Sequence, residues 1–199
     1  MIEPRLIKNL IPIELVNFLD LEFTMIRDCM KKLNSSSGFD DPTVPNSFSW
    51  YSPICFEALS MYIKPIIEKE LGEELYPSYS FGRIYMHGSE LKKHTDRKSS
   101  EITVSCCLRK DPLVDWSLFF EHKNSVYEFN CDVGDAVIGC GNLDPHWRPV
   151  YTGKEHVQAF MQYVRKNGEF SHLKYDTRPC LASPYELTND LIKNEYSNK

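Results

Sequence analysis

The spacing of apolar residues changes near residue 77 of this chain. Before that point, two segments carry apolar side chains at the three- and four-residue intervals of one helix face. The first stripe consists of Leu15, Phe18, Leu19, Ile26, Cys29, Met30 and Leu33. The second consists of Phe56, Leu59, Tyr62, Ile63, Ile66 and Ile67. The pattern therefore predicts two amphipathic helices within residues 1–76, each with one face to bury.

Proline, serine and glycine mark the expected ends of these helices. Pro12 suits a first helical position, where its missing N–H costs no hydrogen bond. Ser52 followed by Pro53 is typical of a helix N-cap and first turn. Pro65 is expected to kink or split the second helix, and Gly72 to end it. The segment between the helices, 34–51, is rich in Ser, Asn, Asp and Pro, which predicts a long loop that acts as a lid or binding loop.

From residue 77 onward the pattern is that of short strands separated by turn residues. Alternation is clear in Ile102, Val104, Cys106 and Leu108, which share one strand face, so the adjacent Cys106 and Cys107 point to opposite faces. Eight such runs predict two packed sheets in a jelly roll, with the helices on one sheet's outer face. The expected strands are 79–87, 90–94, 101–109, 115–121, 125–130, 135–140, 145–150 and 156–165.

The fold class expected is therefore mainly β with N-terminal helices, around a double-stranded β-helix (jelly roll, cupin-like) core. We expect one domain over residues 1–199, with helical support in 1–76, the β core in 77–165 and a C-terminal tail in 166–199. A short helix is predicted near Tyr185–Tyr196 within that tail.

Composition narrows the classes of function. The net charge of −5 argues against nucleic acid as a partner. Seven cysteines without a paired spacing, no secretory signal and no long apolar run predict a soluble, intracellular (cytoplasmic) protein with reduced thiols and no membrane partner. A basic cluster interrupts the acidic balance, as either a solvated loop or a rim that steers an acidic ligand. It comprises Lys92, Lys93, Arg97 and Lys98.

A candidate metal site lies beside this basic cluster. His94 ends a predicted strand and Asp96 follows in the turn, so both side chains can aim at one point. His146 begins the seventh predicted strand, a neighbour of the second in a jelly roll. Two imidazoles and a carboxylate form the facial set of non-heme Fe(II) oxygenases. His–x–Asp alone is a weak motif, and His146 could instead be an ordinary core or surface histidine.

His156 competes with His146 for the third ligand position. If the turn between the last two strands centres on Thr152, then Arg148 faces His156 and His146 lies one pleat further along. This pairing predicts His146 as the ligand, with Arg148 and His156 deeper in the barrel.

The order of several motifs resembles the 2-oxoglutarate/Fe(II)-dependent dioxygenase superfamily, near its prolyl-hydroxylase-like branch of small microbial and viral members. The resemblance covers roughly residues 80–164. Its pieces are RIY at 83–85, HTDR at 94–97, EITVS at 101–105, GDAVIGCG at 134–141, PHWR at 145–148 and an aromatic-rich last strand.

This resemblance implies Fe(II) bound by His94, Asp96 and His146, with 2-oxoglutarate and O2 as co-substrates and ascorbate as an activator. In the family a basic residue on the last strand holds the far carboxylate of 2-oxoglutarate. Here that position is His156, so we expect Arg148 to replace it, with Lys154 as the fallback. Tyr85 resembles the tyrosine that donates to this carboxylate. Substrate contacts are expected from Arg83, Arg97 and Trp147.

The activity implied is hydroxylation of an unactivated C–H bond with release of succinate and CO2. The substrate expected is a protein or peptide residue such as proline, or a small molecule. Two other readings remain open. One is a cupin-like jelly roll that binds a metal or ligand without oxygenase turnover, and the other is a zinc hydrolase built on the same three ligands.

Overall fold

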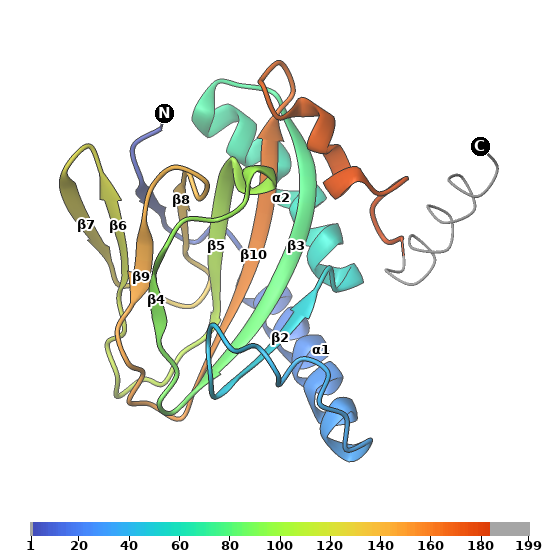
Figure 1. Ribbon diagram of the computed structural model, residues 1–199, viewed down its shortest axis with the longest axis vertical. Helices are drawn as coiled ribbons and strands as arrows, with labels where there is room; N and C mark the ends of the chain where they lie inside the picture. The colour runs from blue at the N-terminus through green and yellow to red at the C-terminus, as the bar shows by residue number, and fades with distance from the viewer. Residues whose placement is uncertain (1, 184–199) are drawn as a thin grey trace.

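The computed structural model describes residues 2–183, in which two antiparallel sheets pack face to face (Figure 1). The larger sheet has the strand order β1-β8-β5-β10-β3-β2, and the smaller has the order β4-β9-β6-β7. The strands of the larger sheet are β1 (Arg5–Ile7), β2 (Ser47–Tyr51), β3 (Leu75–Met86), β5 (Ile102–Arg109), β8 (Ala136–Gly139) and β10 (Glu155–Arg165). Those of the smaller are β4 (Leu91–His94), β6 (Leu118–His122), β7 (Ser125–Phe129) and β9 (His146–Arg148). This confirms the predicted jelly-roll core.

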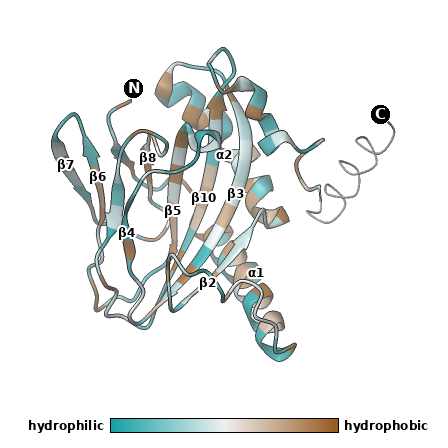
Figure 2. Cartoon of the chain, in the orientation of Figure 1, coloured by the Kyte–Doolittle hydropathy of each residue, from teal (hydrophilic) through white to brown (hydrophobic). Residues whose placement is uncertain are grey.

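Two helices, α1 (Ile13–Lys32) and α2 (Ile54–Leu71), cover the outer face of the larger sheet (Figure 1). Alternate residues of the central strands point toward them, including the predicted stripe on β5. On β10 this outward set is Val157, Ala159, Met161 and Tyr163, all fully buried. Cys106 packs in this cluster and Cys107 in a separate one between the sheets, as expected for neighbours on a strand. Figure 2 shows the hydrophobic colour concentrated on β5, β8 and β10.

The other set of alternate residues faces the smaller sheet. From β3 these are Tyr79, Phe81, Arg83 and Tyr85, and from β10 they include His156, Gln158, Phe160 and Gln162. The mixture of polar and aromatic side chains on this inner face differs sharply from the aliphatic outer face. The larger sheet thus has one face that supplies the core and one that supplies a cavity.

Several expectations about the N-terminal half are wrong in detail. The predicted loop 34–51 contains β2, which pairs with β3, and β1 adds a further edge strand. Both prolines at helix starts are N-caps, so Pro12 and Pro53 precede the first helical residue, and Ser52 makes no side-chain cap. Pro65 does not split α2, because the turns around it are held in the core by Ile63 and Ile67. Gly72 does end α2, in the left-handed conformation with φ 68°.

The described part of the C-terminal tail is ordered against the barrel. A 3₁₀ segment, η2 (Ser171–Thr177), crosses β3 and carries three consecutive residues with positive φ. The helix expected near Tyr185–Tyr196 lies outside the described residues. Within residues 2–183, no helix has both the length and the apolar character needed to cross a membrane.

Gly82 allows the helices to sit close to the sheet. A Cβ at this position of β3 would lie 2.4 Å from the Phe23 ring of α1 and 2.8 Å from the Phe56 ring of α2. We expect Gly82→Ala to lower the free energy of unfolding by about 1–3 kcal/mol, the usual cost of overpacking a core. Denaturant unfolding measures it. The double variant Gly82→Ala/Phe23→Leu should recover part of this loss, and no recovery would contradict the steric explanation.

Candidate active site

His94, Asp96 and His146 meet between the two sheets, at the β4–β9 pair. His94 ends β4 and His146 begins β9, and the two are direct partners in the antiparallel register. Asp96 lies two residues beyond His94, where its backbone N–H donates to the Gly141 carbonyl at 2.8 Å. One potential ligand atom from each side chain lies within 4.8 Å of the others. The structure therefore brings together the three residues expected from sequence to hold a metal.

A β-bulge in β4 gives His94 its direction. Leu91 pairs with Arg148 and His94 pairs with His146, so four residues on β4 match three on β9. In a regular strand, residues 91 and 94 would face opposite sides of the sheet. With one extra residue between them, both side chains line the same cavity.

Both imidazoles present Nε2 toward the carboxylate. The Nδ1 atoms of His94 and His146 lie 2.8 and 3.0 Å from the backbone carbonyls of Lys92 and Asp144, which only accept hydrogen bonds. This fixes the proton on Nδ1 and leaves the Nε2 lone pairs, 3.5 and 3.8 Å from Asp96 Oδ1, available to a cation. Two neutral imidazoles and one carboxylate suit Fe(II), so the donor set fits the metal that the sequence resemblance implies.

Neighbouring groups shift the pKa values of the two histidines in opposite directions. The facing Asp96 carboxylate is the main factor that raises the pKa of His94. Burial lowers the pKa of His146, which is 6% exposed. Both shifts reflect the carboxylate and the dry surroundings that a bound cation would share.

Further contacts hold His146 from behind. The Phe120 ring stacks on it, with centroids 5.0 Å apart. Asp144, whose carbonyl accepts from His146, is itself fixed by His122 Nδ1, at 3.0 Å from its carboxylate Oδ1. His122 and Asp144 are both buried. Outer contacts of this kind orient metal ligands and maintain their basicity.

Gly141 makes room for Asp96. A Cβ on this glycine would lie 2.7 Å from Asp96 Oδ2 and 2.2 Å from Thr103 Oγ1. No other side chain fits there without displacing the carboxylate, which explains the glycine after β8.

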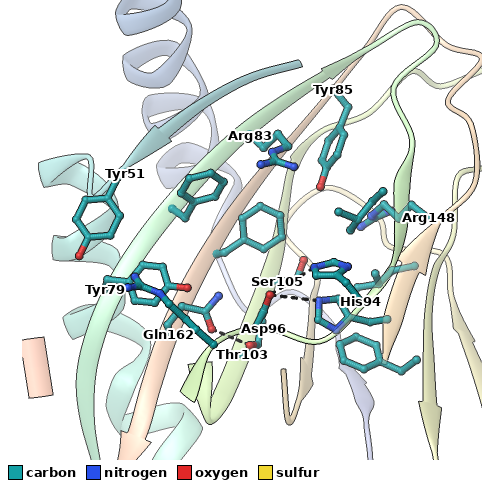
Figure 3. A pocket seen from close by; sticks show the side chains of 17 residues that line it. Tyr51, Tyr79, Arg83, Tyr85, His94, Asp96, Thr103, Ser105, Arg148 and Gln162 are labelled. Carbon is teal, nitrogen blue, oxygen red and sulfur yellow. Dashed lines mark hydrogen bonds and ion pairs between the residues drawn. The ribbon is translucent and has the colours of Figure 1, made fainter. Parts of the chain in front are cut away.

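A cavity of about 260 Å³ opens beside the three ligands (Figure 3). In Figure 3, Arg148, Tyr85 and His94 lie on one side of it and Tyr51 and Tyr79 on the other, with Asp96 between them. Arg83 and Arg97 also line this cavity.

Arg148 is a buried cation without a carboxylate. Its side chain is 2% exposed, its Nη1 donates to the Trp116 carbonyl at 2.8 Å, and its guanidinium lies over the Trp116 ring at 4.7 Å. Its Nη2 has no hydrogen-bond partner, and within residues 2–183 no acidic side chain forms an ion pair with it. Burial lowers the pKa of this guanidinium. A buried, unpaired charge is costly, which indicates that an anion completes this site.

The predicted pairing of Arg148 with His156 is wrong. β9 pairs with β4 and β6, whereas β10 pairs with β3 and β5, because the chain crosses between sheets at 149–154 instead of forming a hairpin. Both residues still point inward and contact the Trp116 ring, His156 with ring centroids 5.0 Å apart. His156 lies behind the cavity wall. Burial, and then the charge of Arg148, hold its pKa well below the usual value, so it is neutral.

The other sequence candidates divide into two groups. Tyr85 lines the cavity, with its hydroxyl pointing inward in Figure 3, as does Arg83, which pairs with Asp41. Lys154 is exposed and does not line the cavity, so the structure does not support it as the fallback cation. Trp147 points to the opposite face of β9, where it stacks on Phe119 with centroids 5.4 Å apart, so it does not line the cavity.

Several lining residues were missed from sequence. Thr103 and Ser105 come from the inner face of β5, and Gln162 from β10; Thr103 donates to Gln162 at 2.7 Å. In the sequence they are the polar positions that alternate with the apolar positions of the same strands. Tyr79 belongs to the same inner row of β3 as Arg83 and Tyr85.

Comparisons by sequence find no match: no family model and no curated protein resembles the chain closely enough. Solved structures do match. A prolyl-4-hydroxylase from Pseudomonas putida shares 14% identity at a TM-score of 0.58, over 83% of this chain and 93% of that one. HygX from Streptomyces hygroscopicus, with nickel and 2-oxoglutarate bound, shares 10% identity at a TM-score of 0.58, over 80% of this chain and 82% of that one. The epimerase SnoN from nogalamycin biosynthesis shares 10% identity at a TM-score of 0.64, over 91% of this chain and 86% of that one.

These similarities show that the chain has the fold of the 2-oxoglutarate/Fe(II) oxygenases. At 10–14% identity they establish the fold alone.

The metal site is testable without turnover. We expect His94→Ala or His146→Ala to weaken Co(II) binding by more than the roughly 10- to 100-fold typical of outer-sphere changes, because each removes a direct ligand. Calorimetry and the visible Co(II) spectrum measure this. His156→Gln, at the rival position, should leave affinity unchanged. A loss in His156→Gln equal to that in His146→Ala would show that the wrong histidine has been chosen.

Proposed function

We propose that this protein is a 2-oxoglutarate- and O2-dependent Fe(II) oxygenase that hydroxylates an unactivated C–H bond. Fe(II) would be held by His94, Asp96 and His146. The observation that carries the proposal is the buried, unpaired Arg148 in the same cavity as these three ligands. A metal site alone fits many activities, whereas a metal beside a buried cation fits a co-substrate with a carboxylate at its far end.

The proposed role of Arg148 is to bind that far carboxylate through Nη2. On β9, Arg148 and His146 lie two apart and face the same way, so a ligand can span from the metal to the guanidinium along the strand. The Tyr85 hydroxyl is directed into the same region and is proposed as a second donor. Burial raises the pKa of Tyr85, which keeps the donating proton in place. Lys154 and Trp147 are not part of this proposed site.

When bound, iron and 2-oxoglutarate would supply the oxidative chemistry, with succinate and CO2 as products. The residues of the chain orient the metal ligands and shield the cavity from water. His94 and His146 are held by backbone carbonyls, Asp96 by the turn that contacts Gly141, and Phe120 closes the wall behind His146. The aromatic lining on the opposite wall, Phe81 and Phe160, excludes water from the space where a substrate carbon would approach.

The substrate proposed is a residue of a protein or peptide, such as proline. A cavity of about 260 Å³ must accommodate the co-substrate and the reacting group together, so only a small part of a substrate enters it. A ring or side chain projecting from a larger molecule meets that limit. The prolyl-4-hydroxylase among the structural neighbours supports this choice, although a small-molecule substrate fits the same space.

Of the two alternatives, only the zinc hydrolase leaves Arg148 unexplained. A zinc hydrolase needs only the three ligands and a water, and leaves the guanidinium unpaired. A jelly roll that binds a metal and a dicarboxylate without turnover would use the same residues. Turnover therefore separates this second alternative from the proposal.

The experiment combines purified protein with Fe(II), ascorbate, 2-oxoglutarate and O2, and measures succinate. We expect slow succinate formation without substrate and faster formation with a proline-containing peptide that gains one oxygen by mass spectrometry. Ascorbate should sustain the slow reaction. Tight binding of 2-oxoglutarate with no succinate under any condition would favour the binding protein.

Arg148→Met tests the co-substrate site separately from the metal. Removing a charged hydrogen-bond donor costs about 1.5–3 kcal/mol, so the concentration of 2-oxoglutarate needed for half-maximal binding should rise about 10- to 100-fold. Co(II) affinity should be unchanged, since no ligand is lost. The matched control is Lys154→Met, which removes the fallback cation and should change neither quantity. If Lys154→Met instead raises the requirement, the assignment of Arg148 is wrong.

A further inference from the structure

Arg97 lies at the mouth of the cavity, one residue beyond the proposed ligand Asp96, and is fixed more firmly than its exposure suggests. Its guanidinium carbon lies 4.1 Å above the centre of the Tyr79 ring, and its Nη2 donates to Asp176 Oδ2 at 2.7 Å. Its side chain is nevertheless 52% exposed. An arginine held on one face and one edge, and open elsewhere, is pre-organised to bind a further group.

Asp176 is positioned by several independent features. The Tyr51 hydroxyl donates to the same Oδ2 atom at 2.6 Å. Burial, followed by this hydrogen bond, raises the pKa of Tyr51 to about 12, so the phenol remains a donor. The backbone at residues 175–177 has φ values of 55°, 56° and 64°, in the left-handed region that disfavours side chains.

The strained segment is anchored to α2 by a buried ion pair. Arg178 pairs with Glu57 of α2 at 2.5 Å, and both side chains are buried. Local strain persists where the surrounding structure enforces it, and it clusters at functional sites. A strained turn, a buried ion pair and the Tyr51 hydroxyl thus combine to hold the Asp176 carboxylate against Arg97.

We propose that Arg97 is the receptor for an anionic group of the substrate, a carboxylate or phosphate that flanks the reacting carbon. The inference rests on the proposed function and specifies its substrate class. A guanidinium binds either anion through paired N–H groups, and Asp176 leaves part of it open. Lys98, exposed and next to Arg97 in the sequence, adds a second positive charge in a chain of net charge −5.

Arg97 suits this role better than the other two arginines of the cavity. Arg83 is 7% exposed, and its guanidinium is engaged by Asp41 and by the rings of Phe81 and Tyr85. Arg148 is buried at the far end and is assigned to the co-substrate. Arg97 alone of these three combines a place at the mouth with an open edge.

The test uses 4-fluorobenzoate, 4-fluorophenyl phosphate and the uncharged 4-fluorobenzamide as probes, followed by fluorine NMR on the metal-free, full-length protein. We expect one or both anions to bind more tightly than the amide. Arg97→Met should weaken binding of the anions at least tenfold and leave the amide unchanged. Which anion binds more tightly distinguishes a carboxylate site from a phosphate site.

Two further variants separate a direct contact with Arg97 from a general effect of positive charge. Lys98→Met removes the same charge one residue away, and an equal loss there would show a general field effect and overturn the proposal. Arg148→Met should weaken 2-oxoglutarate binding and leave the anionic probes unaffected. Probe binding that depends on Arg148 and not on Arg97, or equal binding of the amide and the anions, would also overturn it. No step requires turnover, so a negative result here is separate from a failure to form succinate.

Discussion

The antiparallel pairing of β4 with β9 is the constraint on which the rest of the site depends. It places His94 directly opposite His146 and Leu91 opposite Arg148. Because β4 contains one extra residue between these pairs, Leu91 and His94 both face the cavity. A regular strand would keep the hydrogen bonds and lose a ligand. The geometry of the candidate metal site is therefore a property of the strand register as much as of the three side chains.

The same pairing separates two electrostatic environments along a single strand. At His146, a carboxylate and two neutral imidazoles prepare a place for a cation. Two residues away, Arg148 is a buried cation that lacks an anion among the described residues. Neither end is balanced alone, because a buried charge without a partner is costly. A metal would balance the charge of Asp96 at one end. A carboxylate would balance the charge of Arg148 at the other, and a ligand bound to the metal could carry that carboxylate.

The sequence was sufficient for the parts that depend on local pattern and insufficient for those that depend on connections between sheets. Alternating apolar residues correctly predicted the eight strands from β3 onward and the face that packs on the helices, but β1 and β2 were missed. The motif order correctly selected His94, Asp96 and His146 to lie together. The Arg148–His156 pairing failed because a six-residue connection can turn back or cross over, and its composition does not distinguish these outcomes. Lys154 and Trp147 were misplaced because proximity in sequence to Arg148 and His146 does not fix which way a side chain points.

The C-terminal segment shows a further limit of local reasoning. Residues 171–178 have no periodic pattern, yet they contribute Asp176 to the mouth of a cavity built mainly from strands. Their position is set by a buried pair between Arg178 and Glu57, which are far apart in the chain. Tyr51 comes from β2, which was itself predicted as loop. The residues at this rim thus come from segments whose structure was least visible in the sequence. The candidate metal ligands lie at the bulged β4–β9 pair inside the barrel, whereas the mouth is assembled from irregular segments that can diverge with little cost to the barrel. A fold that keeps its metal ligands can therefore acquire a different substrate by changing only such segments.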